Sequence, residues 1–331
     1  MPPTVSVVMP VYNVARTVAH AVASVLSQSF TEFELIIVDD GGTDDSVAIC
    51  RGFADPRIRI ISQANRGLAG ARNTGISAAI GEFVALLDSD DAMKPEKLER
   101  HVAHLRARPA VGISYAGADL MDDDGQPLGI RQEPKRRGVT ARDVFCGRVI
   151  LNGSIPVFRR EALEQIAFRA PDGAGRWYFD ERFRRSEDVE CWMRLALQTS
   201  WQFAGLPGRY TDYRINRTSL SADVILQLDS WERVYETVRA YAPGFIARHG
   251  DEARARELRY LARRSFHMRD RGMALHLITR ALALRPSLLL GEPVKTGSTL
   301  AACAALRLLP ERSLAALLRT VNPALAGAPS A

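Results

Sequence analysis

The sequence predicts an α/β protein in which a mostly parallel sheet lies between helices, followed by a helical C-terminal region. Through the first 110 residues, short apolar runs rich in Val and Ile alternate with helical stretches. This alternation is typical of right-handed β-α-β units. From Asp223 onward nearly the whole sequence has a helical pattern, and 47% hydrophobic with 25% charged residues is a globular composition.

Four strand and helix pairs are expected in the first half, at 5–9 with 14–27, 33–38 with 46–54, 57–62 with 68–79, and 82–87 with 95–108. Parallel sheets bind ligands at the carboxyl ends of their strands. The candidate site therefore comprises the segments that follow these strands, which are residues 10–13, 39–45, 63–67 and 88–91.

The pattern changes after about residue 111 to mixed strands and loops. Strands are expected at 113–120, 128–132, 155–158 and 209–215, with a helix opening near Glu187. We expect a catalytic domain over 1–222, divided into a nucleotide-binding half (1–110) and an acceptor-side half (111–222). A helical region (223–331) follows, broken at Pro243, Pro286, Pro293 and Pro310.

The positive charge is concentrated near the C-terminus. The chain has a net charge of +6, and from Ser230 onward there are 16 Lys or Arg residues against 8 Asp or Glu. A nucleic-acid-binding catalytic core is therefore not expected. The basic tail is compatible with peripheral contact at an anionic membrane, or simply with solvated helix faces.

The sequence favours a cytoplasmic protein. Its four cysteines are far apart, without metal-ligand spacing. The N-terminus lacks the basic and apolar regions of a signal peptide. The apolar run 296–306 is shorter than the roughly 18 to 20 residues that span a bilayer.

Three carboxylates, those of Asp88, Asp90 and Asp91, follow the fourth expected strand. Crowded like charges favour protonation or a bound cation. Mg²⁺ or Mn²⁺ is the natural occupant, because both take carboxylate ligands and leave positions for phosphate oxygens. The alternative is that these residues only start the helix that follows and bind no ligand.

The other strand ends offer groups suited to a nucleotide. Tyr12, after Pro10, presents an aromatic ring to a base, and Asp40 lies in a glycine-containing loop where a carboxylate can accept hydrogen bonds from a base or ribose. Arg72, near a helix start, is a candidate diphosphate contact. Further along, Glu187 and Asp188 open a helix, either as cap residues or with Asp188 as a fixed general base.

Together these motifs resemble family 2 glycosyltransferases with the GT-A fold, over roughly residues 4–220. The motifs are Val5–Asn13, Leu26–Ser29, Glu34–Gly41, Gly70–Gly75, Asp88–Asp91, Ser186–Asp188 and Tyr213–Asn216. The resemblance implies an inverting transferase that uses a nucleotide-sugar donor, most often a UDP-sugar, and a saccharide or lipid-linked acceptor. It also implies that Pro10, Tyr12, Asp40, Arg72, Asp88 and Glu187 bind substrate, that Asp88, Asp90 and Asp91 hold Mn²⁺ or Mg²⁺, and that Asp188 is the catalytic base.

The sequence departs from the family pattern at three points. Gly42 stands where Ser is usual, and Asn216 stands where His is frequent, which weakens a metal role for that residue. The Gln-x-x-Arg-Trp motif of processive polymerases is absent, which implies single additions.

Other functions fit less well. A nicotinamide-dependent oxidoreductase needs a glycine-rich turn after the first strand, where this chain has Pro10–Asn13. An aspartyl phosphatase needs its acidic motif after the first strand. A catalytically inactive relative that acts as an assembly partner remains the alternative. For the helical tail, membrane docking, covering of the catalytic domain and pairing of subunits all stay open.

Overall fold

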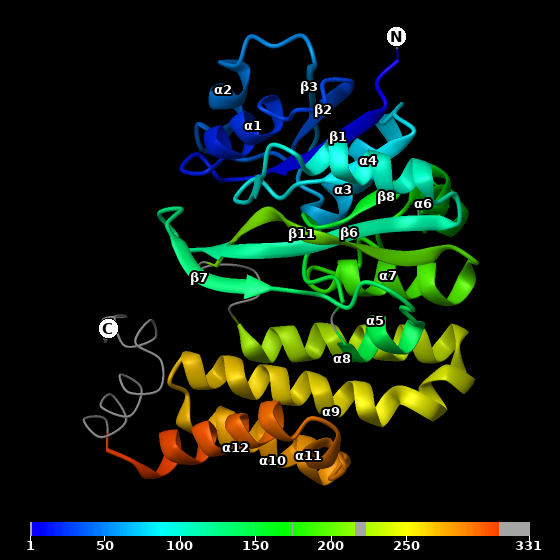
Figure 1. Cartoon of the computed structure of the whole chain (residues 1–331). Coiled ribbons are helices and arrows are strands. Elements are labelled where there is room, and N and C mark those ends of the chain that lie inside the picture. The colour runs from blue at the N-terminus through cyan, green and yellow to red at the C-terminus, as the bar shows by residue number, and fades with distance from the viewer. Residues whose placement is uncertain (1, 148, 172, 174, 216–222, 311–331) are drawn as a thin grey trace. The chain divides into compact units, whose positions relative to one another are not determined.

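A computed structural model describes residues 2–147, 149–171, 173, 175–215 and 223–310. The chain divides into two compact units, Met1–Leu220 and Ser221–Ala331. Figure 1 shows the sheet strands of the first unit and the helices of the second. The predicted α/β architecture with a helical C-terminal region is confirmed.

Within the described residues, the first unit holds a nine-stranded sheet in the order β3-β2-β1-β4-β8-β6-β11-β5, with β7 beside β6. Its strands are β1 (Val5–Val11), β2 (Phe33–Asp39), β3 (Ile58–Ser62), β4 (Phe83–Leu86), β5 (Ala92–Met93), β6 (Val111–Met121), β7 (Pro127–Gln132), β8 (Val157–Arg159) and β11 (Gln202–Arg214). A separate two-stranded ribbon is formed by β9 (Phe168–Arg169) and β10 (Arg176–Trp177).

The sheet is parallel where the nucleotide half is expected and mixed beyond it. Strands β3, β2, β1 and β4 are parallel neighbours, with Val5 opposite both Phe33 and Phe83. Strand β8 then pairs antiparallel with β4 and β6. The parallel pair β6 and β11 runs side by side in Figure 1. The first four strand ends therefore reach the same edge of the sheet, as β-α-β connections require.

Helices of the first unit connect these strands. They are α1 (Val18–Leu26), α2 (Ser46–Arg51), α3 (Gly67–Ala78), α4 (Lys97–Ala107), α5 (Ala141–Gly147), α6 (Arg160–Ile166) and α7 (Glu187–Gln198). The short helices α5 and α6 had no counterpart in the sequence prediction.

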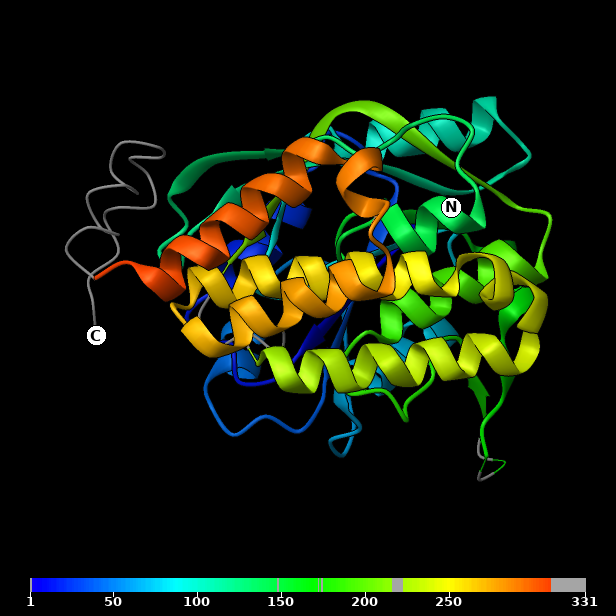
Figure 2. The same ribbon diagram turned by 90° about the horizontal axis from the view of Figure 1, so that it is seen from below.

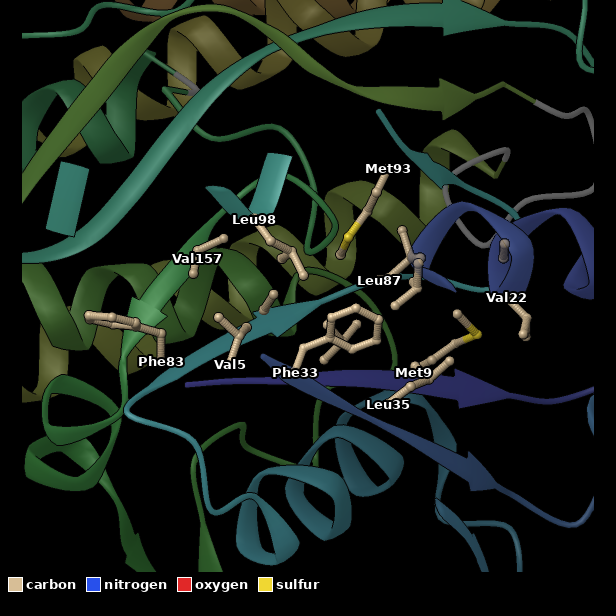
Figure 3. Packing of buried hydrophobic residues seen from close by; sticks show 14 of the residues in the cluster. Val5, Met9, Val22, Phe33, Leu35, Phe83, Leu87, Met93, Leu98 and Val157 are labelled. Atoms are coloured by element: carbon tan, nitrogen blue, oxygen red, sulfur yellow. The ribbon is translucent and has the colours of Figure 1, made fainter. Parts of the chain in front are cut away.

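Strand β1 is buried along its whole length, which is why it reads as an almost continuous apolar run. Its side chains Val5 and Met9 join Phe33 and Leu35 of β2 in one core cluster. Figure 3 shows these residues packed with Leu98 of α4. This core fixes the strand ends from which the candidate site is built.

Strand β11 begins seven residues before the expected Arg209, at Gln202. Its pairing with β6 shifts register between Gly205 and Arg209, and Gly208 has a φ of 102°. Proline and glycine in a strand are typical of such a bulge. The sequence prediction missed the first half of β11 because Pro207 and Gly208 interrupt the strand pattern.

The second unit consists, as far as it is described, of the helices α8 (Val224–Tyr241), α9 (Pro243–His267), α10 (Arg271–Leu284), α11 (Leu288–Gly291) and α12 (Pro293–Leu308). Figure 2 shows α8, α9 and α10 running side by side. Leu258 of α9, Leu277 of α10 and Leu306 of α12 share a separate core. No helix in the described part of the chain is long and apolar enough to cross a membrane.

Candidate active site

The ends of β1 and β2 are held together, which brings three predicted site residues into one place. Pro10 is buried within β1, and Tyr12 directly after the strand is 50% exposed. The amide of Asp40 donates to the carbonyl oxygen of Val11 at 3.0 Å. Tyr12 thus presents a ring to solvent at the strand edge, beside the loop that carries Asp40.

The carboxylate of Asp40 is 2% exposed and organises the start of α3. Its Oδ1 accepts from the amide of Arg66 at 2.8 Å, and its Oδ2 accepts from the amide of Gly67 at 2.8 Å. A second hydrogen bond to Oδ1 comes from the Gln63 side chain at 2.7 Å. These bonds satisfy amide groups that a helix start leaves unpaired. Asp40 therefore shapes the loop before α3 from the end of the neighbouring strand.

Arg72 of α3 connects two of the predicted acidic groups. Its guanidinium is 1% exposed, donates to Asp88 Oδ1 at 2.6 Å and donates to Glu187 Oε1 at 2.6 Å. Burial opposes the charged form, but Asp88, Glu187 and Asp188 together raise the pKa of Arg72. Because Glu187 and Asp88 lie on separate elements, this ion pair network fixes the start of α7 against the acidic loop.

The acidic loop between β4 and β5 carries Asp88 and Asp90, both partly exposed. Burial and the neighbouring charge of Asp88 raise the pKa of Asp90 to about 6. The amide of Asp88 donates to the Ser154 hydroxyl oxygen at 2.9 Å, which holds the start of the loop. The charge of Asp88 thus destabilises the charged form of Asp90 in a fixed backbone arrangement.

Asp91 has a different environment and does not fit the predicted role of metal ligand. It is 1% exposed, its Oδ1 accepts from the amide of Arg214 at 2.9 Å, and its Oδ2 accepts from the Asn152 side chain at 3.2 Å. Burial, followed by the charges of Asp90 and Asp88, raises its pKa well above the usual range. The buried carboxyl group of Asp91 ties the acidic loop to β11.

The remaining carboxylates fit a hard divalent cation. Asp88 and Asp90 offer only oxygen atoms, and positive charge between them would relieve the repulsion that raises the pKa of Asp90. Among the residues that the structure describes, no three His, Cys, Asp or Glu side chains gather around one metal position. Mg²⁺ is usually bound in proteins through one or two carboxylates and substrate phosphates.

Asp188 lies in the first turn of α7, behind a strained backbone position. Ser186 before it has a φ of 58°, a left-handed conformation that non-glycine residues rarely adopt. Burial and the adjacent Glu187 raise the pKa of Asp188 to about 7, against the opposing effect of Arg72. A carboxylate with this pKa can accept a proton near neutral pH.

Sequence reasoning missed two residues that build the site. The Asn73 side chain of α3 accepts from the amides of Tyr178 and Phe179 and donates to the carbonyl oxygen of Phe179, which fixes the segment before α7. Ser154 holds the acidic loop through its hydroxyl group. The sequence signal for Asn73 was its position as a polar residue inside the Gly70–Gly75 motif. Asn216, whose metal role was in doubt, lies outside the described residues.

Comparison with known proteins identifies one family. The family described as Glycosyl transferase family 2 matches residues 6–167. Over 274 residues, the chain is 31% identical to the succinoglycan biosynthesis protein ExoO of Rhizobium meliloti, covering 80% of this chain and 74% of ExoO. It is also 30% identical over 167 residues to WfgD of Escherichia coli, named a UDP-Glc:alpha-D-GlcNAc-diphosphoundecaprenol beta-1,3-glucosyltransferase. That match covers 47% of this chain and 66% of WfgD.

A solved structure shares the fold. The mannosyltransferase PcManGT from Pyrobaculum calidifontis, in complex with GDP-Man and Mn²⁺, superposes with a TM-score of 0.57 at 20% identity. The superposition covers 94% of this chain and 88% of PcManGT. The expected GT-A fold is thereby confirmed.

Proposed function

The chain belongs to glycosyltransferase family 2, and from this premise we propose that it transfers one sugar from a nucleoside-diphosphate donor to an acceptor hydroxyl with inversion. The observation that carries the proposal is the bridge made by Arg72. It joins Asp88 of the acidic loop to Glu187, the neighbour of Asp188, with both contacts at 2.6 Å. This bridge supports the assignment of a leaving-group site at Asp88 and a base at Asp188, because it ties the acidic loop to the start of α7.

The donor nucleotide is assigned to the ends of β1 and β2. Tyr12, half exposed, would stack on the base, with the buried Pro10 before it in β1 and the Asp40 carboxylate shaping the neighbouring loop before α3. WfgD is named for a UDP-linked donor, which favours uridine for this chain. PcManGT was solved with GDP-Man, so the base is a matter for experiment.

Asp88 and Asp90 are assigned to a divalent cation, Mn²⁺ or Mg²⁺. When bound, such a cation stabilises negative charge on the departing diphosphate. Its presence with GDP-Man in PcManGT supports this assignment. Arg72 acts through Asp88 and Glu187 rather than on the nucleotide, because its guanidinium is buried between those carboxylates.

Asp188 is assigned the role of general base. Its carboxylate takes the proton of the acceptor hydroxyl while the acceptor oxygen bonds to the anomeric carbon and the bond from that carbon to the diphosphate oxygen breaks. Attack from the face opposite the leaving group inverts the anomeric configuration without a covalent sugar-enzyme intermediate. The raised pKa of Asp188 matches this task near neutral pH.

The acceptor is assigned to bacterial-type polysaccharide, lipopolysaccharide or other glycoconjugate assembly, in line with the names of ExoO and WfgD. A lipid-linked acceptor implies peripheral membrane contact on the cytoplasmic side. In the second unit Leu290 is 84% exposed and Val294 is 81% exposed, and Lys295 beside them is also exposed. Exposed apolar groups next to positive charge favour anionic lipid surfaces.

Vesicle flotation tests this contact. We expect the full chain to float with vesicles containing phosphatidylglycerol, and Leu290→Glu with Val294→Glu to prevent it. The control Ser298→Glu adds one negative charge at an exposed polar position of α12, the helix that carries Val294. Equal flotation of all variants, or none by the unaltered chain, would remove the membrane contact from the proposal.

A panel of nucleotide sugars incubated with Mn²⁺ tests the proposed reaction, with release of nucleoside diphosphate as the readout. We expect one donor to be hydrolysed slowly without an acceptor, and faster when a suitable glycan or lipid-linked saccharide is added. The alternative, a catalytically inactive binding relative that serves as an assembly partner, predicts donor binding by calorimetry without release from any donor.

A further inference from the structure

Lys97, the first residue of α4, buries its amino group against the segments that flank the acidic loop. Its side chain is 0% exposed. The ammonium group donates to the carbonyl oxygen of Ser154 and, at 2.9 Å, to the Thr211 hydroxyl oxygen. Burial lowers the pKa of Lys97 to about 7, although the charges of Asp91 and Asp88 favour its protonated form.

The two acceptors of Lys97 belong to the segments that hold the acidic loop at both ends. Ser154 accepts the hydrogen bond from the Asp88 amide at the start of the loop. Thr211 lies on β11, where it is opposite Met93 of β5, the strand that directly follows the loop. Lys97 therefore links Ser154, which holds the start of the acidic loop, to Thr211 of β11, which lies beside the end of the loop.

Burying the Lys97 ammonium group in the core costs folding free energy. A buried ammonium group loses its hydration, and apolar side chains of similar volume often give equal or greater stability at such sites. The same helix face continues with His101 and His104, whose Nδ1 atoms both contact the Ser114 hydroxyl oxygen at 2.8 Å. The ring of His101 also packs edge-on against Tyr210 of β11, but of these three side chains Lys97 is the one that donates hydrogen bonds to Ser154 and Thr211.

We propose that Lys97 is a positioning residue of the glycosyl-transfer site, which fixes Ser154 and β11 and thereby sets the spacing of Asp88 and Asp90 for the cation-bound diphosphate. The part concerning the diphosphate rests on the proposed function. The part concerning the loop is a property of the folded chain without ligand.

Hydrogen exchange followed by mass spectrometry tests the role of Lys97 in the chain without ligand. In Lys97→Met, amides of peptides covering residues 86–93 are expected to exchange about tenfold faster, while the melting temperature stays the same or rises. The control His104→Gln changes a polar group on the same face of α4 and should leave exchange at 86–93 unaltered. A folded Lys97→Met with unchanged exchange at 86–93 would overturn the proposal.

A matched pair at Thr211 keeps the test decisive if Lys97→Met does not fold. Thr211→Val removes one acceptor of Lys97 and should accelerate exchange at residues 86–93, whereas Thr211→Ser retains the hydroxyl group and should restore protection. Equal exchange in the two variants would contradict the role of Lys97.

Calorimetry of UDP binding at increasing Mn²⁺ completes the test. We expect Lys97→Met to need about tenfold more Mn²⁺ for half-maximal binding, which a purely structural role would not require. An unchanged Mn²⁺ requirement would refute the link to the diphosphate. If the unaltered chain binds no nucleotide with Mn²⁺, the proposed function fails, and the exchange comparison still decides whether Lys97 positions the loop.

Discussion

Replacing Asp188 by Asn should strongly slow glycosyl transfer and leave donor binding intact. The two side chains have nearly the same shape, so the substitution removes the proton acceptor and little else. General base catalysis contributes about 10²- to 10⁴-fold to a rate. This corresponds to about 3 to 5 kcal/mol of activation barrier. We therefore expect kcat to fall by that factor, with a donor Kd within about threefold of the unaltered chain.

The pH dependence follows from the environment of Asp188. Burial and the adjacent Glu187 raise its pKa to about 7, and only the carboxylate form accepts a proton. In the unaltered chain, kcat/KM should rise about tenfold per pH unit up to pH 7 and then level off. The residual rate of Asp188→Asn should lack this dependence.

Stability should show the opposite dependence on pH. A carboxyl group whose pKa is raised on folding is easier to ionise in the unfolded chain, so the fold loses stability as pH rises from the ordinary Asp value toward 7. Asp188→Asn should therefore melt at a higher temperature than the unaltered chain at pH 8. It should lose that advantage at pH 4.

Both effects can be measured on the same preparations, by release of nucleoside diphosphate from pH 5 to pH 9 and by thermal melting. Donor affinity from calorimetry controls for damage to the donor site. Unchanged turnover in Asp188→Asn would refute the assignment of the base. So would a rate in the unaltered chain that falls between pH 5 and pH 7.

Three further substitutions probe the site. Arg72→Met leaves Asp88 and Glu187 without their shared cation, so urea denaturation should show a loss of about 3 to 5 kcal/mol; a loss below about 1 kcal/mol would contradict the bridge. In Gly153→Ala the new Cβ would lie 2.2 Å from Arg72 Nη2, so melting should reveal a cost of about 1 to 3 kcal/mol together with weaker turnover; normal stability would show that the guanidinium can move aside. Asp90→Ala should remove the Mn²⁺ dependence of nucleotide binding, and binding that EDTA still weakens equally in this variant would argue against Asp90 as a ligand.

The sequence indicated where the site lies because the end of a strand can be recognised from a short stretch of neighbouring residues. Alternation of apolar runs with helices located the first four strands, and the edge rule for parallel sheets then selected the segments that carry Tyr12, Asp40 and Asp88. The helix start at Glu187 was equally local, since acidic residues there favour the first turn.

Partners of these residues were harder to predict, because they are set by tertiary packing. Arg72 and Glu187 are 115 positions apart, and no local pattern shows that they meet. Asp91 belongs to the same short motif as Asp90, yet it is buried and accepts hydrogen bonds from Asn152 and Arg214. Adjacent carboxylates in one motif therefore have different environments.

The position of Lys97 in the sequence does not by itself tell whether the side chain is buried or solvated. Lys97, His101 and His104 recur at helical spacing beside the apolar stripe of Leu98 and Val102 in α4. Polar residues bordering such a stripe are usually solvated. Only the packing of α4 in the folded chain, with Lys97 against Ser154 and Thr211 and both histidines against Ser114, shows that this row is buried.

The placement of β11 between β6 and β5 affects how the protein is made. During translation, the amino-terminal strands leave the ribosome first, but the acidic loop lacks its contact to Arg214, and β5 lacks its pairing with Thr211, until more than 200 residues have been synthesised. Pairings this distant in sequence form slowly. A nascent chain that stops short of residue 214 would display the nucleotide half of the sheet with an unsupported loop. Dividing the gene after the first 110 codons should therefore yield no autonomous nucleotide-binding fragment.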